Sequence, residues 1–516
     1  MLQTEALDIL KMGHNVYLTG AAGSGKTHVL NEFISYLKEN RIGVGITAST
    51  GIAATHMGGM TIHSWAGIGI LDEITEYDME KILGKSPLKK RFRETKVLII
   101  DEISMLHGKR LDMVDEVCRA FLDDTKPFGG LQVVLSGDLF QLPPVTRGGP
   151  ADFVFQSNAW RTMNLKICYL SEQYRQEDQR LLDVLGAIRA NSVDDGHFEH
   201  LQERFKEPPK DTVVTRLYTH NAAVDELNEA ELAKIDAEER VFTMSSTGNQ
   251  RIAEGLANSC LAPEVLTLKV GAEVMFVANN PQESFVNGTL GRVVEFDGEG
   301  LPVVMTDERQ INVKHHSWKL EDGERVAAEV TQLPLRLAWA ITVHKSQGMS
   351  LDAAEVDLSK SFEPGMGYVA LSRVRDLNGL YIKGINNTAM VVNDIVTELD
   401  RQLRNTSDQT RSQLEKVDDK QRDELHKRAR KAMRSDDDKM LDEFDHTVYE
   451  ELRKWRAKTA AKNSVPSYVV FSDNTLKFIS AIKPTSKKEL TKIKGIGDQK
   501  LERYGADVLK IVSDNI

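Results

Sequence analysis

The segment from residue 20 to residue 27 has the clearest spacing for chemistry. It matches the pattern G-x-x-x-x-G-K-[ST], which forms a cradle for the phosphates of a nucleoside triphosphate. Its glycines let successive backbone N–H groups turn toward one point, Lys26 would neutralise phosphate charge, and Thr27 would offer a hydroxyl to Mg²⁺. The expected cofactors are ATP and Mg²⁺, and the cradle consists of Gly20, Ala21, Ala22, Gly23, Ser24, Gly25, Lys26 and Thr27.

Two adjacent carboxylates, Asp101 and Glu102, follow four apolar residues at 97–100. In P-loop enzymes such a strand delivers one acid to the metal and one to the attacking water. We therefore expect Asp101 to hold the Mg²⁺ shell and Glu102 to orient and deprotonate the water. Two solvated acids after a core strand are the alternative, which the P-loop in the same chain disfavours.

Three more polar side chains are candidates for contact with the nucleotide. Gln141 follows an apolar run at 131–135, and its amide, which both donates and accepts, suits a sensor of the γ-phosphate. The planar guanidinium of Arg175 suits a phosphate, although a surface arginine has the same local sequence. Gln3 stands about thirteen residues before the first strand, where an amide can pair with the adenine edge or stay solvated.

Small, hydroxyl-bearing and basic residues occur where a nucleic-acid backbone could approach. The segment 47–54 follows a predicted strand, and its hydroxyls suit either phosphate contact or a cap on the next helix. In the Gly-rich segment 58–65, Trp65 could stack on a base or belong to the core. The predicted DNA-binding residues are Thr47, Ser49, Thr50, His63, Ser64, Thr342, His344, Lys345 and Ser346.

The elements that must position these residues predict an α/β fold with two P-loop-type domains and parallel sheets. The P-loop lies between a predicted strand at 16–19 and a helix at 28–39, and a second α/β unit opens near 213–218. Short strands separated by turns, with the hairpin dipeptide Asn287-Gly288, predict a small inserted β-barrel. The expected domains are 1–180 with a small insertion at about 56–72, 181–400 with the barrel at about 264–333, a connector at 401–463, and a helical domain at 464–516.

Composition narrows the function classes. The chain has 516 residues and a net charge of −11, so any nucleic acid is expected in a local groove rather than on a basic surface. The longest apolar runs are strand-sized and the first residues lack a basic-then-apolar leader, which predicts no membrane partner and a cytoplasmic protein. Three widely spaced cysteines predict buried thiols rather than a metal site.

The C-terminal part differs from the rest of the chain in composition and charge. Residues 385–465 contain neither Gly nor Pro and carry runs of charge, which predicts a solvated connector that is partly helical at best. Residues 473–510 hold nine Lys or Arg against five Asp or Glu, a net charge of +4 on an acidic protein. The glycine turn at 493–497 either presents N–H groups to a phosphate or simply joins two helices.

At this point the sequence resembles the Pif-type DNA helicases of superfamily one, over residues 3–384. The stretch 111–130 is similar to the signature that separates this family from RecD-like helicases, and 465–511 resembles the helicase-and-RNase-D C-terminal (HRDC) domain. The other matching motifs are 20–27, 47–54, 101–104, 137–144, 172–175, 343–348 and 369–373.

The resemblance implies properties that spacing did not show. It implies two RecA-like motor domains and 5′-to-3′ movement on single-stranded DNA. It also implies unwinding of duplexes, forks and G-quadruplexes in repair, recombination or telomere maintenance. Carried onto this chain, Gln3 reads the adenine, Gly348 belongs to the nucleotide site, Arg175 and Arg373 become arginine fingers, and the loop around His63 separates strands.

Two questions of identity stay open from the sequence. The missing N-terminal extension suggests a bacterial or phage, nucleoid-associated protein, acting as a monomer or as a dimer on DNA. The rival functions are an ATP-gated clamp on single strands and an RNA helicase. Glu102, Gln141 and the two arginines disfavour the clamp, and nothing in the sequence specifies reading of a 2′-hydroxyl.

Overall fold

The fold is described from a computed structural model, which covers residues 1–69, 71–144, 151–176, 178–209, 214–278, 280, 283, 285, 289–306, 309–322, 325–434, 443–463 and 465–515. The chain forms two compact units. The first comprises Met1–Lys38 and Gly43–His426, and the second comprises Glu39–Ile42 and Lys427–Ile516. Among the described residues, no helix has the length and apolar character needed to cross a bilayer.

The first α/β domain is built on a six-stranded sheet that is parallel throughout. Its strands are buried along most of their length because helices cover both faces, as parallel sheets require. In order across the sheet the strands are β3 (Met60–Thr61), β2 (Val44–Ala48), β4 (Val97–Asp101), β5 (Gln132–Ser136), β1 (Val16–Gly20) and β6 (Lys166–Leu170). The larger helices are α1 (Gln3–Lys11), α2 (Lys26–Glu39) and α7 (Gly108–Phe121).

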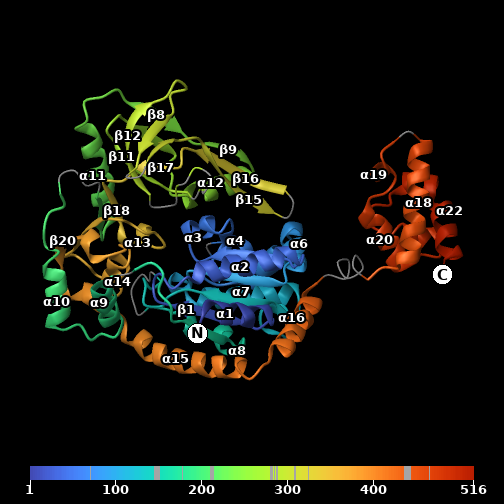
Figure 1. Ribbon diagram of the computed structural model, residues 1–516, viewed down its shortest axis with the longest axis horizontal. Helices are drawn as coiled ribbons and strands as arrows, with labels where there is room; N and C mark the ends of the chain where they lie inside the picture. Colours follow the sequence, from blue (N-terminus) through green and yellow to red (C-terminus); the bar gives the residue numbers. More distant parts are fainter. Residues whose placement is uncertain are drawn as a thin grey trace. The chain divides into compact units, whose positions relative to one another are not determined.

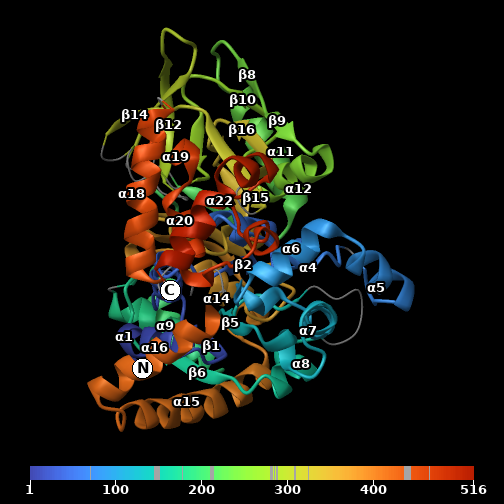
Figure 2. The same cartoon turned by 90° about the vertical axis from the view of Figure 1, so that its right-hand side faces the viewer.

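Three short helices inserted between β3 and β4 pack against α7 (Figure 2). They are α4 (Ile62–Ala66), α5 (Glu76–Leu83) and α6 (Ser86–Glu94). Trp65 is buried, with its ring 4.7 Å from that of Phe92, which stacks in turn on Phe121. Of the two interpretations of Trp65, the structure therefore shows the core residue.

The second α/β domain has a smaller parallel sheet of four strands. Their order is β18 (Ala340–Thr342), β7 (Thr215–Tyr218), β19 (Ala354–Leu358) and β20 (Leu380–Ile385). The helices that belong to it are α9 (Gln179–Arg189), α10 (Asp195–Gln202), α11 (Asn221–Ala233), α13 (Val343–Ser346) and α14 (Met366–Leu371). Cys118, Cys168 and Cys260 are free and buried, as the sequence predicts.

The inserted β part lies between β7 and β18 and is antiparallel (Figure 1). Its main sheet has the order β14 (Gln310–Asn312), β13 (Pro302–Met305), β12 (Leu290–Phe296), β11 (Glu273–Phe276) and β17 (Leu335–Leu337). Two smaller sheets pair β10 (Val265–Leu268) with β8 (Arg240–Thr243), and β15 (His316–Asp322) and β9 (Ser245–Gly248) with β16 (Arg325–Gln332).

The β part begins at β8, earlier in the chain than the predicted 264. The reason is that β9 is polar and exposed at every position, so it shows no alternation of apolar residues, and the helix α12 (Gln250–Ser259) follows it. The predicted hairpin residues Asn287 and Gly288 lie outside the described residues.

The prediction of a connector that is partly helical at best is wrong. α15 (Asp394–Leu414) and α16 (Asp419–Met433) are long helices, and α15 packs along β6 of the first α/β domain (Figure 2). α15 buries only a narrow stripe, including Leu403, Ser407 and Leu414, and most of its other residues are charged or polar. A charged segment without Gly or Pro can therefore be a docked helix, since Lys, Arg and Glu are good helix formers.

The second unit is a small helical domain with its own core. Its helices are α18 (His446–Lys462), α19 (Ser467–Val470), α20 (Asp473–Ile482), α21 (Lys487–Leu490) and α22 (Asp498–Asp514). Leu452, Phe471, Ile479 and Val508 are fully or almost fully buried in that core. α18 falls within the predicted connector, yet Leu452 makes it part of this core.

Candidate ATP-hydrolysis site

The P-loop joins β1 to α2 and has the geometry of a phosphate cradle. Gly23 and Gly25 adopt φ values of +86° and +84°, which favour glycine. A side chain at Gly23 would also come within 2.5 Å of Arg175 Cβ, and one at Gly25 would collide with the amide of Gln3. The loop is therefore packed closely by residues on two sides, which fixes where its N–H groups point.

Lys26 lies at the centre of this loop. Its ammonium donates to the carbonyls of Gly20 at 2.9 Å and Ala21 at 3.0 Å. Burial lowers the pKa of Lys26, and the carboxylates of Asp138 and Glu102 act against that shift. A phosphate would bind this buried cation strongly, because the ammonium is already desolvated and held in place.

The acidic pair stands at the end of β4, next to the P-loop. Burial raises the pKa of Asp101 and of Glu102, and repulsion between the two carboxylates raises that of Glu102 further, whereas Lys26 opposes both shifts. Glu102 has a left-handed backbone, with φ 51°, which is uncommon for a residue other than glycine. This backbone turn aims its carboxylate into the cavity, where Gln347 Nε2 donates to Glu102 Oε2 at 3.2 Å.

Gln141 follows β5 and lines the same cavity. Its backbone N–H donates to the Asp138 carbonyl at 3.0 Å, which holds the turn. The side-chain Oε1 of Gln141 is buried and has no hydrogen-bond partner among the described residues. An orphaned buried acceptor is rare in proteins and calls for a ligand or water.

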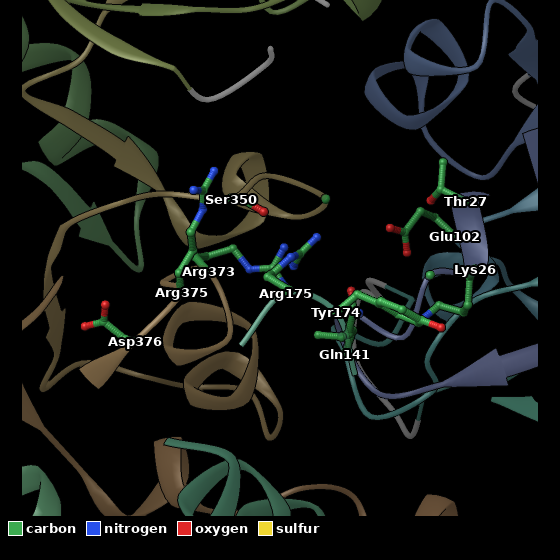
Figure 3. A pocket seen from close by; sticks show the side chains of 14 residues that line it. Lys26, Thr27, Glu102, Gln141, Tyr174, Arg175, Ser350, Arg373, Arg375 and Asp376 are labelled. Carbon is green, nitrogen blue, oxygen red and sulfur yellow. The ribbon is translucent and has the colours of Figure 1, made fainter. Parts of the chain in front are cut away.

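Two arginines face the P-loop side of the cavity (Figure 3). Arg373 is almost fully buried; its Nε donates to Val369 O at 2.8 Å and its Nη2 to Ser372 Oγ at 2.6 Å. Burial lowers the pKa of Arg373 to about 9, and repulsion from Arg175 contributes. Burial also lowers the pKa of Arg175, whereas the carboxylate of Glu102 acts against that shift. An anion between the two guanidinium groups would stabilise both charges.

The cavity has a volume of about 650 Å³ and is lined from both α/β domains. From the first come Ala22, Gly23, Gly25, Lys26, Thr27, Glu102, Gln141, Tyr174 and Arg175, and from the second Gly348, Ser350, Arg373, Arg375 and Asp376. The structure thus brings together residues that lie up to about 350 positions apart in the sequence. The arrangement can bind a polyphosphate between one ammonium and two guanidinium groups, with a carboxylate beside it.

Gln3 and Tyr174 lie at the rim of the P-loop. Gln3 Nε2 donates to the Ser24 carbonyl at 3.3 Å, and both side chains lie against the position of Gly25. Tyr174 is 59% exposed, so its ring offers a face to a ligand. Sequence reasoning named Arg175 and passed over Tyr174, although the adjacent aromatic was a readable signal.

Several predicted DNA-binding hydroxyls are engaged inside the fold. Thr47 is fully buried and donates to the Ile99 carbonyl at 2.7 Å, and buried Ser346 donates to the Val343 carbonyl at 2.8 Å. A side-chain contact from these two residues to DNA is therefore not supported, because their hydroxyls hold the sheet and a short helix. Thr342 is also buried and caps α13.

The other predicted DNA-binding residues are more accessible. Ser49 and Thr50 are half-buried, and Thr50 Oγ1 accepts from Ala53 N at 3.3 Å, which is the helix-capping alternative. Ser64 is exposed, whereas burial lowers the pKa of half-buried His63 to about 4. His344 and Lys345 are likewise half-buried.

The chain was compared with known proteins. A family model described as PIF1-like helicase matches residues 4–185, one described as DNA helicase Pif1, 2B domain matches 252–296, and one described as HRDC domain matches 445–512. The 2B match falls in the inserted β part, and the HRDC match falls in the second unit.

Relatives and solved structures agree with these matches. ATP-dependent DNA helicase Pif1 of Psychrobacter is 44% identical over 83% of this chain and 74% of its own length. The Bdellovibrio bacteriovorus helicase Pif1 is 38% identical over 78% of this chain and 91% of its own length. The crystal structure of Bacteroides sp. Pif1 in complex with ADP-AlF4 covers 78% of this chain and 96% of its own, with 31% identity and a TM-score of 0.69. The chain therefore belongs to the PIF1-like helicases, and it is an ATP-dependent DNA helicase homologue with a C-terminal HRDC domain.

Proposed function

We propose that this chain uses ATP hydrolysis to move 5′-to-3′ along single-stranded DNA and to unwind duplex, forked and G-quadruplex DNA in genome maintenance. The observation that carries the proposal is the cavity shared by the two α/β domains, with Lys26 on one side and Arg373 on the other. Binding and hydrolysis at such a joint change how the two domains meet, and a strand held by both is then moved.

Within the site, the first α/β domain supplies the chemistry on the phosphates. The P-loop N–H groups and Lys26 bind the β- and γ-phosphates, and Glu102 takes the proton from the attacking water. Gln141 orients the water, which donates to its unpartnered Oε1, or the γ-phosphate, to which its Nε2 donates. Gln3 pairs with the adenine edge.

Thr27 and Asp101 fit a magnesium ion. A hydroxyl and a carboxylate are oxygen donors of the kind Mg²⁺ prefers, and burial raises the pKa of Asp101, a cost that a cation offsets. When bound, Mg²⁺ neutralises charge on the phosphates. The protein's own task is to present the two donors, Thr27 at the start of α2 and Asp101 at the end of β4.

The second α/β domain completes the site when it is docked. Its Arg373, together with Arg175 of the first domain, neutralises the charge that develops on the transferred phosphoryl group. Burial, and after it repulsion from Arg175, lowers the pKa of Arg373, and an anion between the two arginines relieves the repulsion. Gly348 of the second domain lines the cavity as well, and a Cβ at this position would lie 4.0 Å from Glu102 Oε1.

We propose single-stranded and forked DNA as the partners. Support comes from the crystal structure of Bacteroides Pif1 bound to single-stranded DNA. A further similar structure is described as the basis for DNA unwinding at forked duplex DNA by two coordinating Pif1 helicases. The predicted contacts on this chain that are not buried are Ser49, Thr50, His63, Ser64, His344 and Lys345. A monomer is proposed for translocation, with two copies on a fork as the alternative.

The expected domain boundaries at 180, 400 and 463 and the bacterial, nucleoid-associated location remain proposals. Bacterial origin is supported by the higher identity to the Psychrobacter relative, 44%, than to the human one, 36%.

One experiment tests the proposed function. Strand displacement is measured on 5′-tailed and 3′-tailed duplexes, in DNA and in RNA, with ATP and Mg²⁺. We expect displacement of the 5′-tailed DNA duplex alone, and none with Lys26→Ala. Displacement of 3′-tailed substrates would show movement in the opposite direction, and unwinding of RNA would show that DNA is not the specific substrate. ATP-dependent binding without displacement would favour the clamp function.

A further inference from the structure

A tyrosine of the second α/β domain bonds to the backbone of the P-loop. Tyr368 Oη accepts hydrogen bonds from the Ala22 N–H at 3.0 Å and from Arg189 Nη1 at 2.9 Å. It donates to Asp138 Oδ2 at 2.8 Å. A phenol oxygen has one donor and two acceptor positions, so its hydrogen-bonding capacity is completely used.

The groups that hold Tyr368 are a buried ion pair. Arg189 Nη1 lies 2.8 Å and 2.7 Å from the two carboxylate oxygens of Asp138, and both residues are buried. The guanidinium also stacks on the rings of Phe140 at 4.2 Å and Tyr368 at 5.3 Å. Removing one member of such a pair is costly, which makes the position of the Tyr368 hydroxyl rigid.

The helix that carries Tyr368 also contacts the other side of the site. α14 is capped by Gly365, where a side chain would come 2.8 Å from the Phe140 carbonyl and 3.3 Å from that of Gln141. After α14 ends, Arg373 Nε donates back to Val369 on the same helix. One rigid segment thus connects the Gln141 turn, the P-loop and Arg373.

We propose that Tyr368 is a positioning residue for ATP hydrolysis, which fixes the Ala22 N–H and hence the shape of the P-loop when the two α/β domains are docked. The inference rests on the proposed function of this cavity. Asp138 and Arg189 position the phenol, and the phenol positions the loop. Tyr368 itself does not contact the reacting atoms.

This arrangement predicts which kinetic constant depends on Tyr368. The bond crosses from one domain to the other, so it exists only in the docked state. The P-loop, Lys26 and Thr27 all belong to the first domain and bind ATP without it. Loss of the hydroxyl should therefore reduce the turnover number with little change in the concentration of ATP needed.

The test is Tyr368→Phe in the full chain, which keeps the ring and its contact with Arg189. With saturating oligothymidylate, ATPase kcat should fall by about tenfold, the scale of one hydrogen bond within a charged network. KM for ATP should change by less than about twofold, and the affinity for a labelled oligothymidylate and the Tm should stay near those of the unchanged protein.

Tyr17→Phe is the matched control. Tyr17 is a fully buried tyrosine of β1, and its hydroxyl donates to the Gly137 carbonyl at 3.3 Å without touching the P-loop. The proposal requires near-normal kcat in this variant. It is overturned by normal kcat in Tyr368→Phe, by an equal loss in Tyr17→Phe, or by a kcat loss that accompanies a lower Tm and weaker DNA binding. Lys26→Ala, assayed in parallel, distinguishes failure of the Tyr368 proposal from failure of the proposed function. ATPase activity in Lys26→Ala would show that this cavity is not the site of ATP hydrolysis.

Discussion

Gln347 Nε2 donates to Glu102 Oε2 at 3.2 Å, so an amide of the second α/β domain holds the carboxylate that we assign as the base in the first. The same amide has a buried Oε1 without a hydrogen-bond partner among the described residues. The contact ties the protonation of Glu102 to the docking of the domains, because a donated hydrogen bond stabilises the ionised acid. We therefore expect hydrolysis to be favoured in the docked arrangement.

Replacing the base should separate ATP binding from turnover. Glu102→Gln keeps the size of the side chain but cannot take a proton, so kcat should fall by about a hundredfold or more. Binding of a labelled ATP analogue to the P-loop should persist. Normal turnover in this variant would mean that another group activates the water.

The rate should also depend on pH through Glu102. Burial and then Asp101 raise its pKa, and the base works only when ionised, so kcat falls as the pH falls through this raised value. The acid limb of the DNA-stimulated rate should lie above the usual range of a glutamate. Gln347→Ala removes a hydrogen bond that lowers this pKa and should move the limb to still higher pH. If the acid limb lies at the same pH in Gln347→Ala as in the unchanged protein, the interdomain contact does not influence the pKa of Glu102.

Removing the P-loop cation should stop the chemistry. In Lys26→Ala the developing phosphate charge loses its fixed ammonium, and turnover should drop by at least about 10²-fold. Binding of single-stranded DNA at low salt should survive, because Lys26 lies in the nucleotide cavity. Filter binding and ATPase assays on one preparation measure both properties, and near-normal hydrolysis would remove Lys26 from the site.

Arg373→Ala tests the two-domain site. Loss of an arginine finger lowers kcat on the order of 10³-fold in related phosphoryl-transfer enzymes, and we expect a similar loss here. Arg401→Ala is the control, since Arg401 is an exposed residue of α15 that forms an ion pair with nearby Glu398 at the surface. An unchanged DNA-stimulated rate in Arg373→Ala would show that the domains do not meet around ATP.

Two truncations distinguish the roles of the C-terminal segments. A chain ending at Arg434 keeps α15 and should retain DNA-stimulated ATPase, while losing a salt-sensitive part of its DNA affinity or processivity through loss of the positively charged HRDC domain. A chain ending at Asn405 cuts α15 and removes Ser407, whose Oγ accepts from Tyr169 N at 3.0 Å on β6. We expect a lower Tm and weaker ATPase for the shorter chain. Equal Tm values would show that the end of α15 contributes nothing, and unchanged DNA affinity at Arg434 would point to a protein-docking role for the HRDC domain.

Local patterns predicted a large part of this molecule. The P-loop and the acid pair on β4 are contiguous segments in which spacing and apolar runs carry the information, so their elements could be read from the sequence. Asp138, Arg189 and Tyr368 could not, because each is ordinary in its own segment and only the topology brings the three together. For Thr47 the sequence predicted a DNA contact that the structure does not support. A hydroxyl at a strand end looks available in the sequence, but here it donates a hydrogen bond to the Ile99 carbonyl of the neighbouring strand.

The path of α15 has a mechanical consequence. The chain leaves the first α/β domain after β6, enters α9, and later returns from β20 to lay α15 along that same strand β6. The two connecting segments, from β6 to α9 and from β20 to α15, thus lie beside the same edge strand. Rotation of one domain about that edge stretches neither segment, whereas sliding or twisting strains both. We therefore expect rotation about this edge to strain the two connecting segments less than sliding does.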